Sequence, residues 1–177
     1  MSKYILLLLC TMLGNTQKLI YEFNKNSKSD WNIVDDIVMG GRSNGGFSVN
    51  KDGHGVFSGD VSLENNGGFS SVRHHLPETL NLSKYTHVKL KLKGDGSYYQ
   101  FRLKEGAYDR HSYKKEFETT GRWQEIDLAF KDFIPTFRGR TLDMPEFNGE
   151  KLSDITFLIG NKKAQRFELE VEWIKAY

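Results

Sequence analysis

The residues whose types could carry out chemistry gather between Asp35 and Gly45. The run Gly41-Arg-Ser-Asn-Gly45 matches the G-x-S-x-G pattern of hydrolases, in which a strand, a sharp turn and a helix expose a nucleophilic serine, here Ser43. Residues 46–50 are typical of a turn or strand, so the required helix is missing. The same glycines lack the Gly-Lys-Ser/Thr ending of a phosphate-binding loop. We therefore expect a glycine-rich loop and no catalytic residue.

Residues of metal-binding type are also present. Asp35 and Asp36 could give oxygen ligands to calcium, but Ca²⁺ takes six or more oxygens and the sequence indicates no others. His74 and His75 are adjacent, and adjacent strand residues point to opposite faces, so the pair does not suit one zinc ion. Cys10 is the only cysteine, which excludes a disulfide scaffold and a cysteine zinc site. We predict no cofactor, with structural calcium as the open alternative.

The charged residues do not favour a glycosidase or a nucleic-acid binder. The chain has 25 Lys and Arg against 23 Asp and Glu, a net charge of +2. Glu168, Glu170 and Glu172 are spaced as the outward face of a strand rather than as a catalytic carboxylate pair. Nucleic-acid binders normally carry a clear basic excess, which is missing here. We therefore expect no nucleic-acid partner.

A local basic stripe is the exception to this charge balance. Lys89, Lys91 and Lys93, with Arg102 and Lys104 on the strand expected beside them, could follow a nucleic-acid backbone. Acidic residues nearby favour a solvated face instead.

Sugar binding is a second use for exposed aromatic and polar residues in this region. Tyrosines stack on pyranose rings while arginines reach the hydroxyls, and the residues of these types are Tyr98, Tyr99, Arg102, Tyr108 and Tyr113. Alternate strand residues face inward, so we expect about half of such a set in the core.

Short strands must position these residues. Val88, Leu90 and Leu92 alternate with lysines, which is typical of a strand with one face on the core. No apolar helical periodicity is sustained for three turns. Besides 88–93 and 167–173, we predict strands at 19–23, 55–63, 68–74, 97–104, 111–119, 123–130 and 154–159. About nine strands in 177 residues predict one all-β domain, a sandwich.

The turn residues suggest how these strands connect. Asn65-Asn-Gly-Gly68 and Gly94-Asp-Gly96 each separate two predicted strands, and such residues tolerate the positive φ of tight turns, so we expect hairpins at both places. Residues 130–152, with Pro135 and Pro145, predict one long irregular connection.

The N-terminus differs from the rest of the chain. Lys3 precedes the apolar run 4–13, and residues 14–16 are small or polar, which is typical of a short export signal. We predict a signal peptide at 1–16, a domain at 17–177 and an exported protein, periplasmic or extracellular. The alternative is that this run is a first strand or helix of the domain in a cytoplasmic or membrane-associated protein. No later segment approaches the ~20 apolar residues of a membrane span.

Five segments together carry a resemblance to a known family. They are WNIVDDIVMGGRS at 31–43, FSG at 57–59, LENNGGFSSVR at 63–73, KGDG at 93–96 with Tyr99, and FIPTFRGR at 133–140. In this order and spacing, over about residues 21–177, the chain resembles the complex I intermediate-associated protein 30 family. The resemblance implies a galactose-binding-like jelly-roll sandwich, similar to carbohydrate-binding modules, without a catalytic residue set. It also implies assembly of respiratory complex I, the NADH:ubiquinone oxidoreductase.

The shared motifs have a physical interpretation. We expect their glycines to allow tight turns, Trp31 and Phe69 to anchor the core, and Arg73 and Arg138 to pair with nearby aspartates. Such a polar cluster is either structural or lines a binding surface. The residues in question are Trp31, Asp35, Asp36, Met39, Gly40, Gly41, Ser43, Asn65, Asn66, Gly67, Gly68, Arg73, Asp95, Tyr99 and Arg138.

Together these observations predict a non-enzymatic binding module with two candidate partners. The first is a protein partner, a membrane or respiratory complex for which the chain acts as an assembly factor or chaperone, and it predicts an apolar or mixed surface patch. The second is a polysaccharide, and it predicts a concave face with Tyr98, Tyr113 or Trp123 exposed beside Arg and Asp. An exported chain would not meet the cytoplasmic arm of a bacterial complex. If the export signal is used, the assembly role of the family therefore does not transfer directly to this chain.

Overall fold

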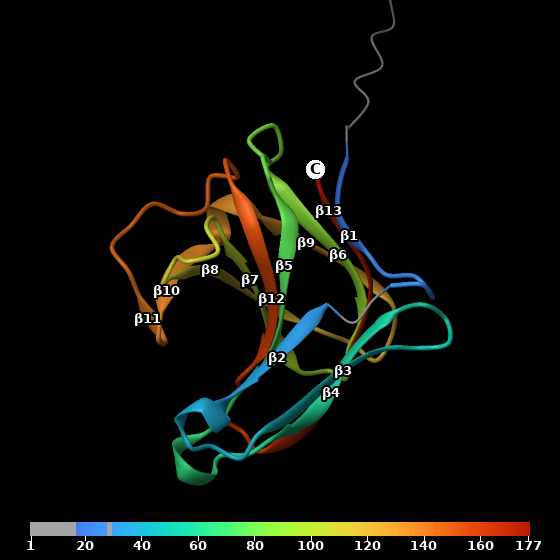
Figure 1. The fold of residues 1–177 in the computed structure, drawn as a ribbon, viewed down its shortest axis with the longest axis vertical. Helices are drawn as coiled ribbons and strands as arrows, with labels where there is room; N and C mark the ends of the chain where they lie inside the picture. Colours follow the sequence, from blue (N-terminus) through green and yellow to red (C-terminus); the bar gives the residue numbers. More distant parts are fainter. Residues whose placement is uncertain (1–16, 28–29) are drawn as a thin grey trace, which may run out of the picture.

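Two antiparallel sheets packed face to face form the molecule (Figure 1). The structure is a computed structural model that describes residues 17–27 and 30–177. The predicted signal peptide at 1–16 lies outside the described residues. Within the described residues, no helix has the length and apolar character needed to cross a membrane. The predicted all-β sandwich is confirmed.

Thirteen strands make up the two sheets in the described part of the chain. The six-stranded sheet has the order β3-β4-β13-β6-β9, with β1 also paired to β13. Its strands are β1 (Lys18–Glu22), β3 (Asn44–Val49), β4 (Gly55–Val61), β6 (His87–Lys93), β9 (Gln124–Ala129) and β13 (Gln165–Ala176).

The second sheet has seven strands in the order β11-β10-β8-β7-β12-β5-β2. Its strands are β2 (Trp31–Asp35), β5 (Ser70–Leu80), β7 (Tyr98–Lys104), β8 (Ser112–Glu118), β10 (Ile134–Phe137), β11 (Arg140–Thr141) and β12 (Leu152–Ile159). Three 3₁₀ turns, η1 (Asp36–Met39), η2 (Glu64–Asn66) and η3 (Phe130–Asp132), complete the elements.

The core lies between the sheets, where the period-two patterns place their apolar residues. Leu90 and Leu92 of β6 are fully buried, and their lysine neighbours point out, as predicted. Trp31, 4% exposed, joins the two layers because its ring stacks on Phe47 of one sheet and Phe157 of the other, with ring centroids 5.5 and 6.0 Å away. Full burial of one such large side chain contributes about 1.5–3 kcal/mol or more.

Two segments contain strands that the sequence patterns did not predict. The segment 31–49 forms β2 and β3, and the connection expected at 130–152 contains η3, β10 and β11. The period-two signal is weak in both places because glycines occupy β3 and β10 has only four residues.

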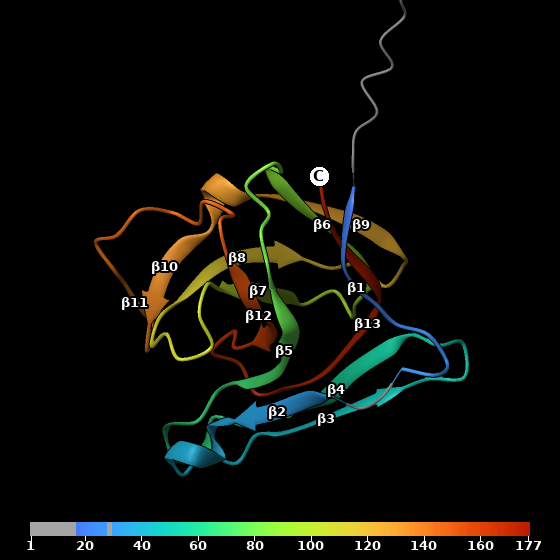
Figure 2. The ribbon, with the colours of Figure 1, turned by 45° about the horizontal axis from the view of Figure 1, so that its top comes forward.

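Both predicted hairpins are wrong. β4 and β6 belong to the six-stranded sheet, whereas β5 and β7, which follow them, belong to the other sheet. The turns at 65–68 and 94–96 therefore carry the chain from one layer to the other (Figure 2). Their residues do adopt positive φ, as expected, at Asn65, Asn66, Gly68 and Gly96.

Candidate functional site

A buried carboxylate organises the segment that carries the family motifs. Asp36 is fully buried at the start of η1. Its two oxygens accept hydrogen bonds from the Ser43 amide (2.9 Å) and hydroxyl (2.5 Å) and from the amides of Gly68 (2.6 Å) and Phe69 (3.1 Å). Burial alone would raise the pKa of Asp36, but these hydrogen bonds outweigh it and hold that pKa below its ordinary value.

Asp35 ties the same segments together from the other side of the backbone. It accepts hydrogen bonds from the Ser70 hydroxyl at 2.5 Å and from the Gly45 amide at 2.9 Å. The Asn65 side chain donates to the Gly40 carbonyl at 3.1 Å. The aspartate cluster, Asp35 and Asp36 with their donors, thus links η1, the start of β3, η2 and β5.

Two motif glycines are required by this cluster. A Cβ atom on Gly41 would lie 2.2 Å from Asp36 Oδ1, and one on Gly67 would lie 2.6 Å from Asp36 Oδ2. Any side chain at these positions would push the carboxylate out of its place. The conspicuous motif residues therefore build a scaffold.

The aspartate cluster does not suit the chemistry considered for it. Four hydrogen bonds already occupy both oxygens of Asp36, and its surroundings offer N–H and O–H donors rather than the further oxygen ligands that calcium needs, so this carboxylate does not fit an ion. Ser43 is fully buried, its hydroxyl donates to Asp36, and it accepts from the Ser62 amide at 3.0 Å. These contacts leave Ser43 no route to a substrate.

The expected arginine pairs are not formed. Among the described residues, neither Arg73 nor Arg138 has an ion pair with Asp35, Asp36 or Asp95. Protein hydroxyl and amide donors satisfy those carboxylates without arginine.

Asp95 stabilises a turn between the layers. It accepts from the Ser97 amide, the Tyr99 hydroxyl and the Glu168 amide at 2.9, 3.2 and 3.0 Å. Tyr99 is core, and burial followed by the Asp95 charge raises its pKa. A Cβ atom on Gly94 would lie 2.3 Å from Thr119 Oγ1, so only glycine leaves room for the threonine side chain.

An apolar surface lies at the tip of the motif segment. Ile37, Val38 and Met39 on η1 are 60, 74 and 67% exposed, and Leu63 beside η2 is 45% exposed. We call these four residues the apolar knuckle. The turns η1 and η2 lie together at the lower end of the molecule in Figures 1 and 2, and the Asn65–Gly40 hydrogen bond joins them.

A groove runs from the knuckle across the outer face of the seven-stranded sheet. Its volume is about 1070 Å³, and Met39, Leu63 and Phe69 line one end. Phe69 is half-buried there and is not the core anchor that we predicted. Asn66, Gly67, Gly68, Thr156 and Leu158 also face this space.

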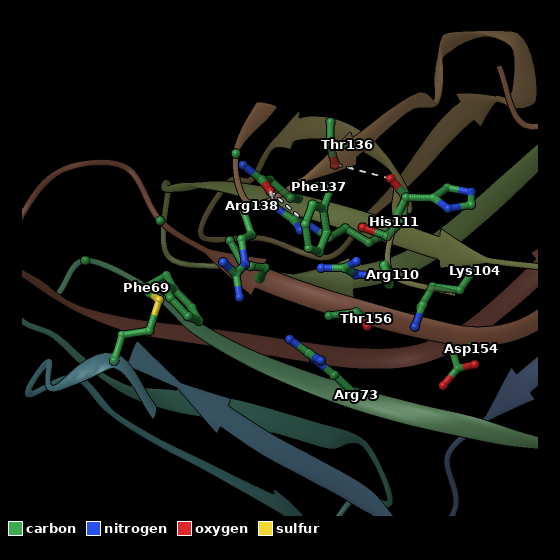
Figure 3. Close-up of a pocket in the computed structure, with 18 of the residues that line it drawn as sticks. Phe69, Arg73, Lys104, Arg110, His111, Thr136, Phe137, Arg138, Asp154 and Thr156 are labelled. Atoms are coloured by element: carbon green, nitrogen blue, oxygen red, sulfur yellow. Dashed lines mark hydrogen bonds between the residues drawn. The ribbon is translucent and has the colours of Figure 1, made fainter. Parts of the chain in front are cut away.

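The groove is strongly cationic. Among the described residues, its lining has six basic side chains and a single carboxylate, Asp154; the basic side chains are Arg73, Arg102, Lys104, Arg110, Arg138 and Lys162. In Figure 3 the side chains of Arg73, Arg110 and Arg138 converge on the groove from three separate segments. None of the six forms an ion pair with a carboxylate in the part of the chain that the structure describes.

The strand register explains why two arginines lie together. Arg73 on β5 and Arg102 on β7 are both paired with Thr156 of the intervening strand β12. Two strand spacings separate their backbones by roughly 10 Å, and both side chains rise from the same face. Burial and then the Arg73 charge lower the pKa of Arg102 to about 10, which leaves it charged at neutral pH.

The aromatic residues proposed for sugar stacking lie elsewhere. Tyr99 and Tyr113 are core, Trp123 contacts His54 at the other sheet, and Tyr108 is fully exposed without lining the groove. Tyr98 borders a second depression of about 480 Å³, which adjoins the groove at Gln100, Gly160 and Lys162. The aromatic rings that do line the groove, in the described residues, are Phe69, Phe137 and the imidazole of His111.

The basic stripe predicted from the sequence is also divided. Lys89, Lys91 and Lys93 lie on β6 of the six-stranded sheet, whereas Arg102 and Lys104 lie on β7 of the other. The β6 lysines face carboxylates, with Lys91 Nζ 2.9 Å from Glu172 and Lys93 Nζ 3.8 Å from Glu170.

One cluster of metal-ligating types borders the groove. Ligand atoms of Glu105, Asp109 and His111 all lie within 4.8 Å of one another. Glu105 accepts from the Tyr113 hydroxyl at 3.3 Å and Asp109 from the Gly106 amide at 2.7 Å, so both carboxylates are already used in local structure. His74 and His75 point to opposite sides: His74 is core beside Trp31, and His75 is exposed near Asp154.

Solved structures of carbohydrate-binding modules share this fold. A family 11 module from Clostridium thermocellum, solved in complex with a β-1,3-1,4-mixed-linked tetrasaccharide, superposes with a TM-score of 0.66 at 18% identity, covering 90% of this chain and 94% of the module. A family 29 carbohydrate-binding module gives a TM-score of 0.53 at 7% identity, with 92 and 91% covered. Identities this low support a common fold alone.

Sequence comparisons show the family of the chain. An uncharacterised protein of Schizosaccharomyces pombe is 28% identical, covering 84% of this chain and 78% of its own length. A probable mitochondrial complex I intermediate-associated protein 30 of Caenorhabditis briggsae is 27% identical over 92% of this chain, which spans only 55% of that relative. Residues 21–171 match the family model of the complex I intermediate-associated protein 30. The chain belongs to the complex I intermediate-associated protein 30 family.

Proposed function

We propose that this chain is a non-enzymatic binding module that holds a protein partner, in a role related to the assembly of a respiratory membrane complex. The observation that carries the proposal is the apolar knuckle. Three consecutive apolar side chains stay in water on a turn that a buried aspartate fixes in place. The names of the Caenorhabditis relatives support the class of partner.

The energetics of the knuckle suit a docking surface. Apolar side chains that are exposed to water in the free chain are hydrated unfavourably. Covering each one on association would contribute up to about 1.5–3 kcal/mol to the binding free energy. Because η1 is already ordered, little conformational entropy is lost when a partner covers it. The groove beside the knuckle extends the surface that such a partner would contact.

The contacts of the candidate catalytic residues support a binding role without catalysis. Ser43, Asp35 and Asp36 are buried and hydrogen-bonded to the scaffold. We propose that the module needs no cofactor. We keep the proposal of an export signal at 1–16, and hence of a periplasmic or extracellular location. In that location the chain would reach only subunits of the complex on the outer side of the membrane, whereas a cytoplasmic or membrane-associated chain, the alternative, could also reach the cytoplasmic arm.

Polysaccharide binding is the second candidate function. It is favoured by one observation, the common fold with a module solved in complex with a tetrasaccharide. The aromatic residues that we expected to stack on sugars lie outside the groove, which places this candidate second.

Affinity capture from detergent-solubilised native membranes tests the proposal. The baits are the wild-type chain, a variant with Ile37→Ser, Val38→Ser and Met39→Ser, and the control Leu19→Ser, an exposed apolar residue of β1. We expect subunits of NADH:ubiquinone oxidoreductase on the wild type and the control, and their loss from the triple variant. Equal recovery by the triple variant would contradict the knuckle's role, and elution by mixed-linkage β-glucan would favour the carbohydrate function.

A further inference from the structure

The groove holds positive charge that the fold does not neutralise. Six basic side chains face one carboxylate along its lining in the described residues. By contrast, the lysines of β6 on the opposite face each have a carboxylate within 4.0 Å. A set of like charges without counter-charges raises the free energy of the folded state, and such sets commonly mark binding sites for the opposite charge.

Arg73 and Arg102 form the centre of this charge. The Arg102 guanidinium donates to a neutral acceptor, Gln100 Oε1, from Nε at 3.0 Å and Nη2 at 2.6 Å. Glu116, the nearest acid on β8, is engaged by Gln100 and Lys114. Arg102 thus spends two N–H groups on one acceptor, and the Arg73 guanidinium makes no hydrogen bond among the described residues, so both keep donors for a ligand. Guanidinium groups pair best with planar carboxylates.

The aromatic residues of the groove distinguish between acidic ligands. A sugar ring needs an open aromatic face, but the Phe137 ring has Arg110 5.0 Å and Arg138 5.4 Å from its centroid. The end of the groove at Met39, Leu63 and Phe69 is apolar and suits aliphatic or aromatic side chains. Cationic and apolar subsites in one channel fit a polypeptide better than an acidic polysaccharide.

We infer that the groove binds an extended, acidic segment of a polypeptide, with its carboxylates on Arg73 and Arg102 and an apolar residue at the knuckle end. This inference rests on the proposed function in that the partner is a protein. In an extended chain, alternate side chains on one side are separated by about 6.5–7 Å, so successive acidic residues can reach the row of basic groups. The segment would carry aspartate or glutamate at every second position.

Direct binding of defined probes tests the inference. The probe is a fluorescein-labelled peptide of alternating glutamate and serine that ends in leucine, and the readout is anisotropy at 50 mM and 300 mM NaCl. We expect saturable binding that weakens with salt, because surface charges are screened. The double variant Arg73→Gln/Arg102→Gln should bind at least tenfold more weakly, and Arg73→Lys/Arg102→Lys should lose less, because charge is kept without the planar fork.

Matched controls make each outcome decisive. Lys91→Gln/Lys93→Gln removes the same charge from the opposite face and should change the affinity less than twofold. Thermal unfolding of each variant shows whether it is folded. No saturable binding by the wild type, equal binding by the Arg→Gln variant, or tighter binding of polygalacturonate or of neutral β-glucan than of the peptide would overturn the inference.

The two proposals fail in different ways. If the peptide does not bind but the knuckle variant still loses the respiratory subunits, the acidic-segment inference is wrong and the proposed function stands. If the arginine variant loses the peptide but the knuckle variant captures those subunits normally, the assignment of the knuckle is wrong.

Discussion

The molecule has two charge clusters that differ in how they are satisfied. The aspartate cluster is buried, and Asp36 by itself accepts four hydrogen bonds. Arg73 and Arg102 lie in an accessible groove, close enough to repel each other, and among the described residues neither has a carboxylate within ion-pair distance, although Asp154 and Glu116 attract them from farther away. A satisfied buried charge stabilises a local structure, whereas an unsatisfied accessible one is available to a ligand.

This difference separates the recognisable motif from the surface that we propose binds a partner. The motif residues at 35–43 and 64–70 build a scaffold around Asp36. This scaffold holds η1 in its position. The groove residues come from separate strands and loops. We therefore expect changes in the first cluster to affect stability and changes in the second to affect binding.

Removal of the Asp36 carboxylate should have the largest effect. In Asp36→Ala, the amides of Ser43, Gly68 and Phe69 lose their acceptor inside the protein. Loss of a hydrogen-bonded buried charge with its network costs about 3–5 kcal/mol. Urea unfolding, monitored by tryptophan fluorescence, measures this loss of unfolding free energy. A loss below 1 kcal/mol would show that Asp36 does not hold the scaffold together.

A smaller loss should follow from crowding the same carboxylate. Gly41→Ala places a methyl group 2.2 Å from Asp36 Oδ1, and overpacking of this kind costs about 1–3 kcal/mol. Gly121→Ala is the matched control, because a Cβ there meets no atom within 4 Å. Similar unfolding free energies for the two variants would contradict the tight fit.

The protonation of Asp36 should weaken the scaffold in acid. Its pKa is depressed in the folded state below the ordinary 3.8, so its contribution is complete above about pH 4 and is lost as the pH falls through the folded pKa. The ¹³C shift of the Asp36 carboxyl, followed from pH 6 to 2, should give a midpoint below 3.8. A midpoint at or above that value would mean that burial outweighs the hydrogen bonds.

Stability should respond least to the groove. Arg73→Gln removes a charge that has no ion-pair partner within 4.0 Å among the described residues, and the repulsion from Arg102 that it relieves offsets the attraction to Asp154 that it loses. Its unfolding free energy should therefore change by less than about 0.5 kcal/mol. Differential scanning calorimetry of this variant beside Asp36→Ala compares the two clusters directly. A loss above 1 kcal/mol would make Arg73 a structural residue.

The sequence predicted the layers of the fold better than their connections. Val88, Leu90 and Leu92 indicated a half-buried strand because side-chain alternation is local. The turns at 65–68 and 94–96 could not be assigned in the same way, because positive φ suits a hairpin and a crossover between sheets equally well.

The candidate site was predicted only in part. The motif identified the aspartates, glycines and Ser43 as a group, and Arg73 and Arg138 as functional candidates, but it gave the arginines the wrong partners. The proximity of Arg73 and Arg102 depends on β12 lying between β5 and β7, and β12 is about 50 residues later in the chain than β7. Such a long-range register has no local sequence signal, so the sequence indicates only contacts with sugar hydroxyls or a basic stripe for Arg102.

Backbone hydrogen exchange with and without the acidic peptide tests the central claim most directly, because it locates the ligand on the molecule. We predict added protection at the edges of the groove, in residues 62–69, 105–112 and 136–140, with no change in β6 and β13 of the opposite sheet. Protection on the six-stranded sheet, or unchanged exchange at a saturating peptide concentration, would contradict it.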